Sequence, residues 1–525
     1  MVSPVFAGRE AELTMLATAF KQAASAGPAT VLVGGEAGSG KSRLIGEFAA
    51  KVRGSTGPEG VLVLSGSCPE MSGAGLPYAP FTAIVRQLAD ELGTDEPGAA
   101  EKEALLSGPA HADLAHADLA GLLHESGPLG GGGARAGLFE RLARLFSRLA
   151  LAVPLILVAE DAHRADRSTR DLLRFLVRSG RLTRVLILVT FRSDEIHRTH
   201  PLCPLLAELC RAPDVSRLEL PRLQRAEVAA QLAGILGQSP APAIAEAAHA
   251  RTGGIPLFVE AIVKDDGTLR CCRPNSPRDL LLESVQRLPE DTQQILRVAS
   301  ASSGCIGHGL LAAVTGLSEQ ALCVALQPAV AANVLVSTKD GYEFLHSLTR
   351  EAVHDDLFAA EHVNVHSMFA EALEADPSLA TCRPSLQLTL HWRSAHTYDR
   401  AMLAAWRAAA DAEAACAYAE QLEMLLQMLE LWEQVPSAAR QIGTDHPGIL
   451  GRAARAAHLA GDQGRCTRLA RAALSELDET CAADRNSMLR LLAGREVDPA
   501  GGSRVAGRAV RSASARAGTY SQGYR

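Results

Sequence analysis

The chain has 525 residues and a mass of 55.3 kDa, which predicts about three or four domains rather than one hydrophobic core. Hydrophobic residues make up 47% of the chain and charged residues 21%, a balance that excludes an intrinsically disordered protein. The net charge of −7 does not indicate a general nucleic-acid or membrane surface.

Cysteine usage and hydropathy indicate the compartment. The 11 Cys form an odd number and include no C-x-x-C pair, so we expect a reducing compartment. The amino terminus has no basic segment followed by an apolar one. The longest apolar run, Leu149–Ala159, is far shorter than the roughly 18 residues that cross a bilayer. We therefore expect a cytoplasmic protein with no membrane partner.

Five apolar runs in the first part of the chain predict strands, and helical or loop segments separate them. Runs this continuous are typical of strands buried on both faces, so we expect a parallel α/β sheet over residues 28–222. A Gly- and Ala-rich passage at 93–134 predicts an insertion or a flexible loop. The predicted strands are Thr30–Val33, Val61–Leu64, Leu155–Ala159, Val185–Val189 and Leu218–Leu220.

Helical periodicity dominates from residue 225 onward. Several helices followed by a short hairpin, Val334–Ser337 with Tyr342–Phe344, are the pattern of a winged helix. Segments 400–434 and 449–478 each predict a helix pair similar to a tetratricopeptide repeat (TPR). The predicted domains are a P-loop ATPase domain at 1–222, a helical lid at 223–275, a winged-helix domain at 276–360, TPR-like repeats at 361–495 and a disordered Arg-rich tail at 496–525.

Residues 35–42 read GEAGSGKS and satisfy G-x-x-x-x-G-K-[ST] between a predicted strand and a predicted helix. Glycines let the backbone curl around a phosphate, so that N–H groups and the helix N-terminus face it. The lysine can then reach the β- and γ-phosphates, and the serine hydroxyl can hold Mg²⁺. The predicted nucleotide-binding residues of this loop are Gly35, Gly38, Gly40, Lys41, Ser42 and Arg43.

Two acids and one arginine follow neighbouring predicted strands. Glu160 and Asp161 end the run that starts at Leu155, and Arg192 ends the next run. We expect Glu160, together with Ser42, to orient Mg²⁺ and Asp161 to polarise the attacking water, although the two acidic roles could be exchanged. Arginine offers bidentate geometry to a γ-phosphate, so Arg192 is the third candidate catalytic residue.

Several motifs in unchanged order resemble the signal-transducing AAA-like (STAND-type) NTPases. More narrowly, they resemble the ATPase half of large LuxR-type bacterial transcriptional regulators, and they are similar to the ATPase modules of soluble adenylyl cyclases. The motifs are FAGREAEL, GGEAGSGKSRL, LPYAPF, LILVAEDAHRADRSTRDLLRFL, LILVTFRSDEI, RTGGIPLFVEAI and FLHSLTREAVHDDL. The resemblance covers about residues 4–475 and implies a P-loop NTPase fold that binds ATP or ADP with Mg²⁺.

The resemblance also implies roles for residues that spacing alone does not assign. It makes Arg192 the sensor of the γ-phosphate, and it places Pro256 near adenine and Val5 to Arg9 along the base pocket. His346 falls where related switches place a histidine that contacts the β-phosphate of ADP and keeps the molecule closed.

The chain departs from the family pattern at three places. Arg164 replaces the usual Trp of E-D-x-H-W-A-D, and Ile255 replaces the Asn before the lid proline. No helix-turn-helix pattern follows residue 430, so the resemblance implies a chain truncated before its DNA-binding domain.

His362 and His366 have a zinc-compatible spacing, but no third ligand is evident, and we interpret them as a solvated helix face.

Three functions remain open at this stage. The leading hypothesis is an ATP-binding switch with slow ATP hydrolysis that self-associates in its ATP form and senses a protein or small-molecule inducer on its helical repeats. The first alternative is a DNA-binding regulator that uses the winged helix or the basic tail, although DNA binding by this chain is doubtful. The second alternative is a nucleotide-binding scaffold that does not hydrolyse ATP and serves protein partners.

Overall fold

The computed structural model describes residues 5–55, 60–69, 77–93, 132–263, 277–302, 304–380, 383–478 and 481–493. Two compact units make up the chain. The first contains Met1–Leu123 and Leu142–Gln387, and the second contains His124–Arg141 and Leu388–Arg525.

The first unit is built on a five-stranded parallel sheet in the order β2-β3-β4-β1-β5. Its three central strands, β3, β4 and β1, are almost wholly buried, as their unbroken aliphatic runs require, whereas the edge strands are partly exposed. Because all the strands run in one direction, their carboxyl ends share one edge of the sheet. The strands are β1 (Ala29–Gly35), β2 (Leu62–Ser67), β3 (Leu155–Glu160), β4 (Val185–Arg192) and β5 (Val215–Leu220).

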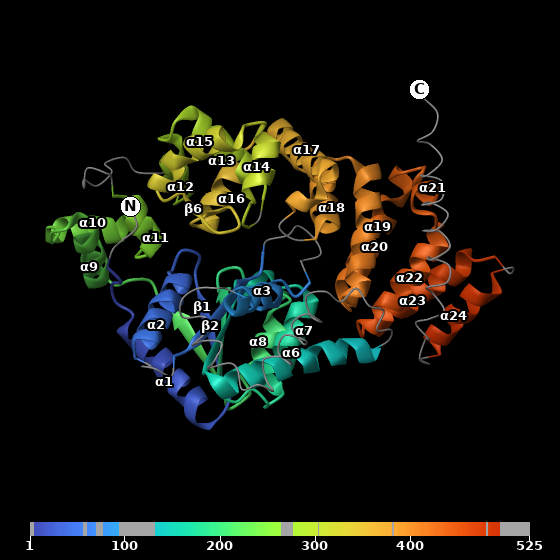
Figure 1. Cartoon of the computed structure of the whole chain (residues 1–525), viewed down its shortest axis with the longest axis horizontal. Coiled ribbons are helices and arrows are strands. Elements are labelled where there is room, and N and C mark those ends of the chain that lie inside the picture. The colour runs from blue at the N-terminus through green and yellow to red at the C-terminus, as the bar shows by residue number, and fades with distance from the viewer. Residues whose placement is uncertain are drawn as a thin grey trace. The chain divides into compact units, whose positions relative to one another are not determined.

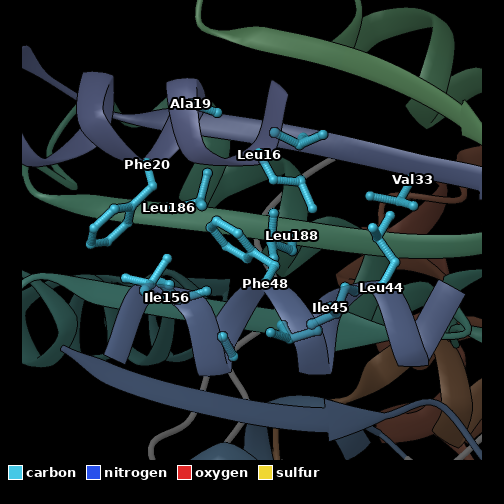
Figure 2. Packing of buried hydrophobic residues seen from close by; sticks show 14 of the residues in the cluster. Leu16, Ala19, Phe20, Val33, Leu44, Ile45, Phe48, Ile156, Leu186 and Leu188 are labelled. Carbon is cyan, nitrogen blue, oxygen red and sulfur yellow. The ribbon is translucent and has the colours of Figure 1, made fainter. Parts of the chain in front are cut away.

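Helices cover the sheet, and α1 (Glu10–Ala26) and α2 (Lys41–Ser55) pack on one face of it. Their apolar side chains interlock with those of β1, β3 and β4, as Figure 2 shows for Phe20, Phe48 and Leu188. Figure 1 shows α7 and α8 on the other side of the strands. The remaining helices of this region are α3 (Ala79–Gly93), α6 (Gly132–Ala152), the short η2 (Ala162–Arg164), α7 (Arg167–Arg178) and α8 (Cys203–Leu209).

Three helices follow the sheet: α9 (Arg225–Leu236), α10 (Pro242–Thr252) and α11 (Pro256–Ala261). They share a hydrophobic core centred on Val228, Leu232 and Val259. The first two helices end at glycines with positive φ, Gly237 and Gly253, which close a helix without a Cβ clash.

Four helices and a hairpin come next, in the order expected for a winged helix. The hairpin pairs β6 (Leu335–Ser337) with β7 (Tyr342–Phe344) in antiparallel register. The helices are α12 (Pro277–Gln286), α13 (Glu290–Ala299), α14 (His308–Thr315) and α15 (Glu319–Ala331). The hairpin leads into α16 (Ser347–Asp355), and α17 (Ala359–Ala375) packs against α14. The short η3 (Pro377–Leu379) and α18 (Pro384–Ser394) follow.

The second unit is helical, and its helix pairs cross closely over alanines such as Ala409 and Ala457. A turn at Cys416, with φ of 55°, joins α19 to α20, and a turn at Gly461, with φ of 78°, joins α22 to α23. The helices are α19 (Tyr398–Ala414), α20 (Tyr418–Leu431), η4 (Trp432–Gln434), α21 (Ala438–Ile442), α22 (His446–Leu459), α23 (Gln463–Glu476) and α24 (Ala482–Leu492).

The structure confirms the predicted fold class: a parallel sheet with flanking helices, followed by helical segments with one small hairpin. All five predicted strands and both hairpin strands form. Most of the predicted insertion, namely residues 94–131, and the whole of the predicted tail at 496–525 lie outside the described residues.

Within the described ranges, no single helix has both the length and the apolar character needed to cross a membrane. One bent pair, His308–Thr315 with Glu319–Ala331, passes the same test of length and composition, with an angle of 102° between its helices.

Candidate nucleotide site

The glycine-rich loop joins β1 to the N-terminus of α2. Gly38 and Gly40 have φ of 77° and 91°, which side-chain-bearing residues rarely adopt. The Lys41 ammonium is buried and donates to the carbonyls of Gly35, at 2.8 Å, and Glu36, at 2.9 Å. Burial lowers the pKa of Lys41, and Arg192 lowers it further, while Asp161 and other nearby acids raise it. The loop therefore presents a helix N-terminus and one concentrated positive charge, a combination that binds phosphate.

The start of α11 and the residue before it lie against this loop. The backbone N–H of Leu257 donates to the Gly38 carbonyl at 3.4 Å. A Cβ on Gly38 would lie 3.0 Å from the Leu257 Cβ and 3.2 Å from the Ile255 side chain, and a Cβ on Gly40 would lie 4.0 Å from Pro256. Pro256 thus lies next to the phosphate loop, and its place near adenine stays a prediction. Glycine at residue 38 is a requirement of close approach as well as of backbone conformation.

Two arginines fasten the loop to its surroundings. Arg43 on α2 forms an ion pair with Glu260 of α11 at 3.2 Å and lies over the ring of Phe6. Arg9 donates to the Ser39 carbonyl at 3.5 Å and to the Pro221 carbonyl at 2.5 Å. The predicted binding role of Arg43 thus coincides with a structural one, because its guanidinium connects α2 to the lid.

The acidic pair lies opposite the phosphate loop. Glu160 accepts a hydrogen bond from the Ser42 hydroxyl, with 2.5 Å between the oxygens. Burial raises the pKa of Glu160, the Ser42 hydroxyl lowers it in part, and Asp161 raises it again. Asp161 has φ of 54°, and its backbone N–H donates to the Thr190 hydroxyl at 2.9 Å. A partly buried carboxylate, a hydroxyl in contact with it and a second carboxylate beside it are hard oxygen ligands that fit a divalent cation such as Mg²⁺.

Arg192 is the last residue of β4. The strand register pairs it with Gly35 on the neighbouring β1, at the start of the phosphate loop. Its guanidinium donates to Glu195 at 2.5 Å, to the Ser347 hydroxyl at 2.7 Å and to Glu351 at 3.1 Å. Only 5% of the residue is exposed. Burial opposes its charge, but Glu351 and Glu195 outweigh burial and raise the pKa of Arg192. The candidate sensor is therefore fully charged and held in place by two carboxylates.

Helix α16 meets the sheet edge through Glu351. The same carboxylate oxygen accepts from Arg192 and from Arg164, the latter at 2.5 Å. Burial raises the pKa of Glu351, but the two arginines overcome that effect and hold its pKa below the usual range. Arg164, the departure from the family pattern, is thus a contact between the segment after β3 and α16.

His163 occupies the space beneath these charges and was not singled out by the sequence. Its Nδ1 accepts the backbone N–H of Arg192 at 3.4 Å, which leaves the proton on Nε2, and Nε2 lies 3.4 Å from the Glu195 carboxylate. Burial, aided by the nearby cations Arg164, Arg192 and Lys41, lowers the pKa of His163 to about 2. The ring is therefore neutral and lies beside the Arg192–Glu195 ion pair, in contact with the backbone of one and the carboxylate of the other.

The hairpin and the start of α16 complete the described surroundings. His346 precedes Ser347 and takes the N-cap position of α16 without capping the helix with its side chain. Burial lowers the pKa of His346 to about 4, so its imidazole is neutral near pH 7. Glu343 on β7 is exposed at the surface, but partial desolvation by neighbouring protein atoms raises its pKa, and the charge of Glu160 adds to this effect. The hairpin thus adds a carboxylate, not predicted from the sequence, whose charge interacts with that of Glu160.

The AAA ATPase domain family matches residues 5–189. Over these residues the chain is similar to that family. The match includes the phosphate loop and the acidic pair and ends just before Arg192. An uncharacterised protein of Rhizobium meliloti (strain 1021) is 22% identical over 459 residues, which cover 81% of this chain and 43% of the relative. The chain therefore spans less than half the length of that relative.

Two solved structures are similar to the whole chain or to most of it. One is the STAND protein with a tetratricopeptide repeat sensor from Pyrococcus horikoshii, at 14% identity and a TM-score of 0.47, covering 99% of this chain and 79% of that one. The other is the Orc1 protein of Aeropyrum pernix in complex with DNA, at 16% identity and a TM-score of 0.31, covering 68% of this chain and 94% of that one.

Proposed function

We propose that the chain is an ATP-binding switch with slow hydrolysis, the signalling module of a LuxR-type transcriptional regulator. The observation that carries the proposal is the contact between Arg192 at the sheet edge and Glu351 of α16. A nucleotide controls a conformational equilibrium only through contacts that differ between the two states. A γ-phosphate beside the loop would compete with Glu351 and Ser347 for the same guanidinium, and this competition gives ATP and ADP different effects on α16.

In this proposal each residue of the AAA ATPase domain has one task. The loop from Gly35 to Lys41 binds the phosphates, and Lys41 turns from its own loop carbonyls toward them. Ser42 and Glu160 would hold Mg²⁺, which neutralises phosphate charge when bound. Asp161 orients the attacking water. Pro256 and the covering lid exclude solvent from the loop.

His346 keeps its proposed role as a contact to the β-phosphate of ADP. Its neutral imidazole can donate one hydrogen bond to a phosphate oxygen, and its neighbour Ser347 already bonds the sensor arginine. We also keep as proposals the cytoplasmic location, the five domain boundaries, the choice of ATP, and an inducer bound by the helical repeats. Self-association of the ATP form would follow from release of α16.

Two measurements test the switch and its chemistry. The mass of the purified particle is compared with ADP bound and with a non-hydrolysable ATP analogue bound. We expect a monomer with ADP and a larger assembly with the analogue, and equal masses would contradict the switch. Phosphate release is then compared between wild type and Asp161→Asn; a fall of at least about 100-fold supports slow hydrolysis. Equal background rates in both would favour the non-hydrolysing scaffold.

A further inference from the structure

Three histidines meet at the corner where α16 ends and α17 begins. His354 lies in the last turn of α16, and His362 and His366 lie one turn apart on α17. One ring nitrogen of each lies within 4.8 Å of the other two. This arrangement corrects the interpretation of His362 and His366 as a solvated face, because the third ligand comes from a different helix and His366 is buried, with 4% exposed.

The rings pack against one another, with centroid separations of 4.9 Å for His354 and His362, 5.6 Å for His354 and His366, and 4.5 Å for His362 and His366. His354 and His362 are each half-buried. The cluster therefore has one enclosed member and two members that solvent reaches, so an ion can enter and keep an exchangeable position.

A neighbouring hydroxyl sets the tautomer of His354. The Ser300 hydroxyl donates its proton to the Arg297 carbonyl at 2.7 Å, and its oxygen lies 3.4 Å from Nδ1 of His354. Since that hydroxyl proton is already used, Nδ1 must carry the ring proton and donate it to Ser300. The lone pair is then on Nε2. A hydrogen bond from the other ring nitrogen is what orients histidines that bind metals.

The charged groups around the cluster favour neutral ligands. The carboxylates of Asp356 and Glu361 are both paired with Arg297, at 3.2 Å and 2.7 Å. An ion here would be held by imidazole nitrogens, which suit zinc, copper, nickel and cobalt rather than Mg²⁺.

We propose that His354, His362 and His366 bind one divalent transition-metal ion, with water in the remaining position. Zinc takes imidazole nitrogen at about 2.0–2.1 Å, so two nitrogens on one tetrahedral ion lie roughly 3.3 Å apart. The nitrogens of this cluster need to close by no more than about 1.5 Å, which rotations of the two half-buried rings supply.

The ion would cross-link two helices at a position relevant to the switch. Ser347, Glu351 and His354 follow one another at spacings of four and three, which place them along one stripe of α16. Fixing the end of α16 to α17 would resist displacement of the helix that holds Arg192. This second part rests on the proposed function, whereas the metal site itself does not.

The test uses the full chain without a polyhistidine tag, freed of metal by a chelator. Co²⁺ is titrated and followed by visible absorption, and Zn²⁺ is used as the competitor. We expect one ion per chain, and a loss of affinity of at least about 100-fold in His354→Gln and in His362→Gln, more than follows from removing a residue that only orients a ligand. The matched control is His396→Asn in the second unit, which should bind like wild type.

Absence of a stoichiometric ion in wild type would overturn the proposal, and so would equal affinity in His354→Gln and in the control. Circular dichroism of each variant separates lost binding from lost folding, and His362→Gln changes only a half-buried ring. ADP affinity is measured with and without Zn²⁺. A change of at least about threefold supports the link to α16, and no change overturns that link while the metal site stands.

Discussion

The carboxyl edge of the sheet and the helical repeats use charge in opposite ways. At the sheet edge, strand ends bring Lys41 and Arg192 inside the protein, and each is enclosed by groups that stabilise it. In the repeats, alanines fill the helix crossings, and although Glu420 is buried, the ion pair of Arg452 with Glu413 lies near the surface, with the carboxylate side chain 50% exposed. A buried charge is costly to leave without its partners, so a ligand that competes for those partners can shift the conformation of the first region. Surface ion pairs contribute little to stability, so losing one changes the second region less.

The largest expected effect is on nucleotide binding. Lys41→Ala removes the buried ammonium that faces the phosphate loop, and we expect ADP affinity to fall at least about 100-fold, measured by calorimetry. All three tryptophans, at 392, 406 and 432, lie in the second unit, whereas Lys41 lies in the first. The tryptophan fluorescence of the variant should therefore equal that of wild type. ADP affinity equal to wild type would show that the loop does not bind phosphate.

The next effect compares two carboxylates that pair with arginine. Glu351→Gln weakens two charged hydrogen bonds and should destabilise α16 locally by about 1–3 kcal/mol. Glu413→Gln removes one exposed pair and should cost less than about 1 kcal/mol. Hydrogen exchange of the amides at 347–355 should accelerate several-fold to about 100-fold in the first variant only. Equal exchange in both variants would mean that Glu351 does not hold α16.

A pH effect should come from His163. Its pKa is lowered to about 2 in the folded protein, against roughly 6.5 when unfolded. Below pH 6.5 only the unfolded chain takes up this proton, so the histidine costs about 1.4 kcal/mol of stability for each further pH unit. Between pH 7.0 and 5.5, His163→Asn should lose about that much less than wild type in urea unfolding followed by circular dichroism. An unaltered pH dependence would contradict a neutral buried ring, and His396→Asn is the control.

The smallest effect isolates the lid contact. Gly38 and Gly461 have nearly equal φ, 77° and 78°, but a Cβ at residue 461 would meet nothing within 4 Å. Replacing either by Ala should cost about 1 kcal/mol of backbone strain. Only Gly38→Ala should also push Leu257 and reduce ADP affinity, by about three- to tenfold. If both variants bind ADP like wild type, the lid does not close on the loop as described.

Sequence patterns predicted local structure far better than they predicted partners. The strands, the hairpin and the phosphate loop each depend on neighbouring residues, so periodicity and spacing reveal them. The partners of Arg192 on α16 are 155 and 159 residues away along the chain. Nothing in a single sequence pairs Arg192 with Ser347 and Glu351, although the motif FLHSLTREAV contains both.

His163 and His354 were missed for a related reason. A neutral buried ring is defined by its surroundings. For His163 the available signal was its place in the E-D-x-H motif, and for His354 it was the number of histidines near α16 and α17. Arg164 was noticed solely as a departure from a pattern. Its contact with Glu351 depends on the packing of α16 against the sheet edge, which no local rule supplies.

One carboxylate oxygen of Glu351 accepts hydrogen bonds from two guanidinium groups, that of Arg192 at the end of β4 and that of Arg164 in η2, after β3. A phosphate that draws Arg192 away still leaves Arg164 attached, so the helix would pass through a singly tethered stage before it leaves the sheet. Such a tether would divide the release of α16 into two steps. The free-energy cost of the second step would be set by Arg164, which does not contact the nucleotide in this proposal. Variation at residue 164 could then adjust how readily the molecule opens while the nucleotide pocket stays the same.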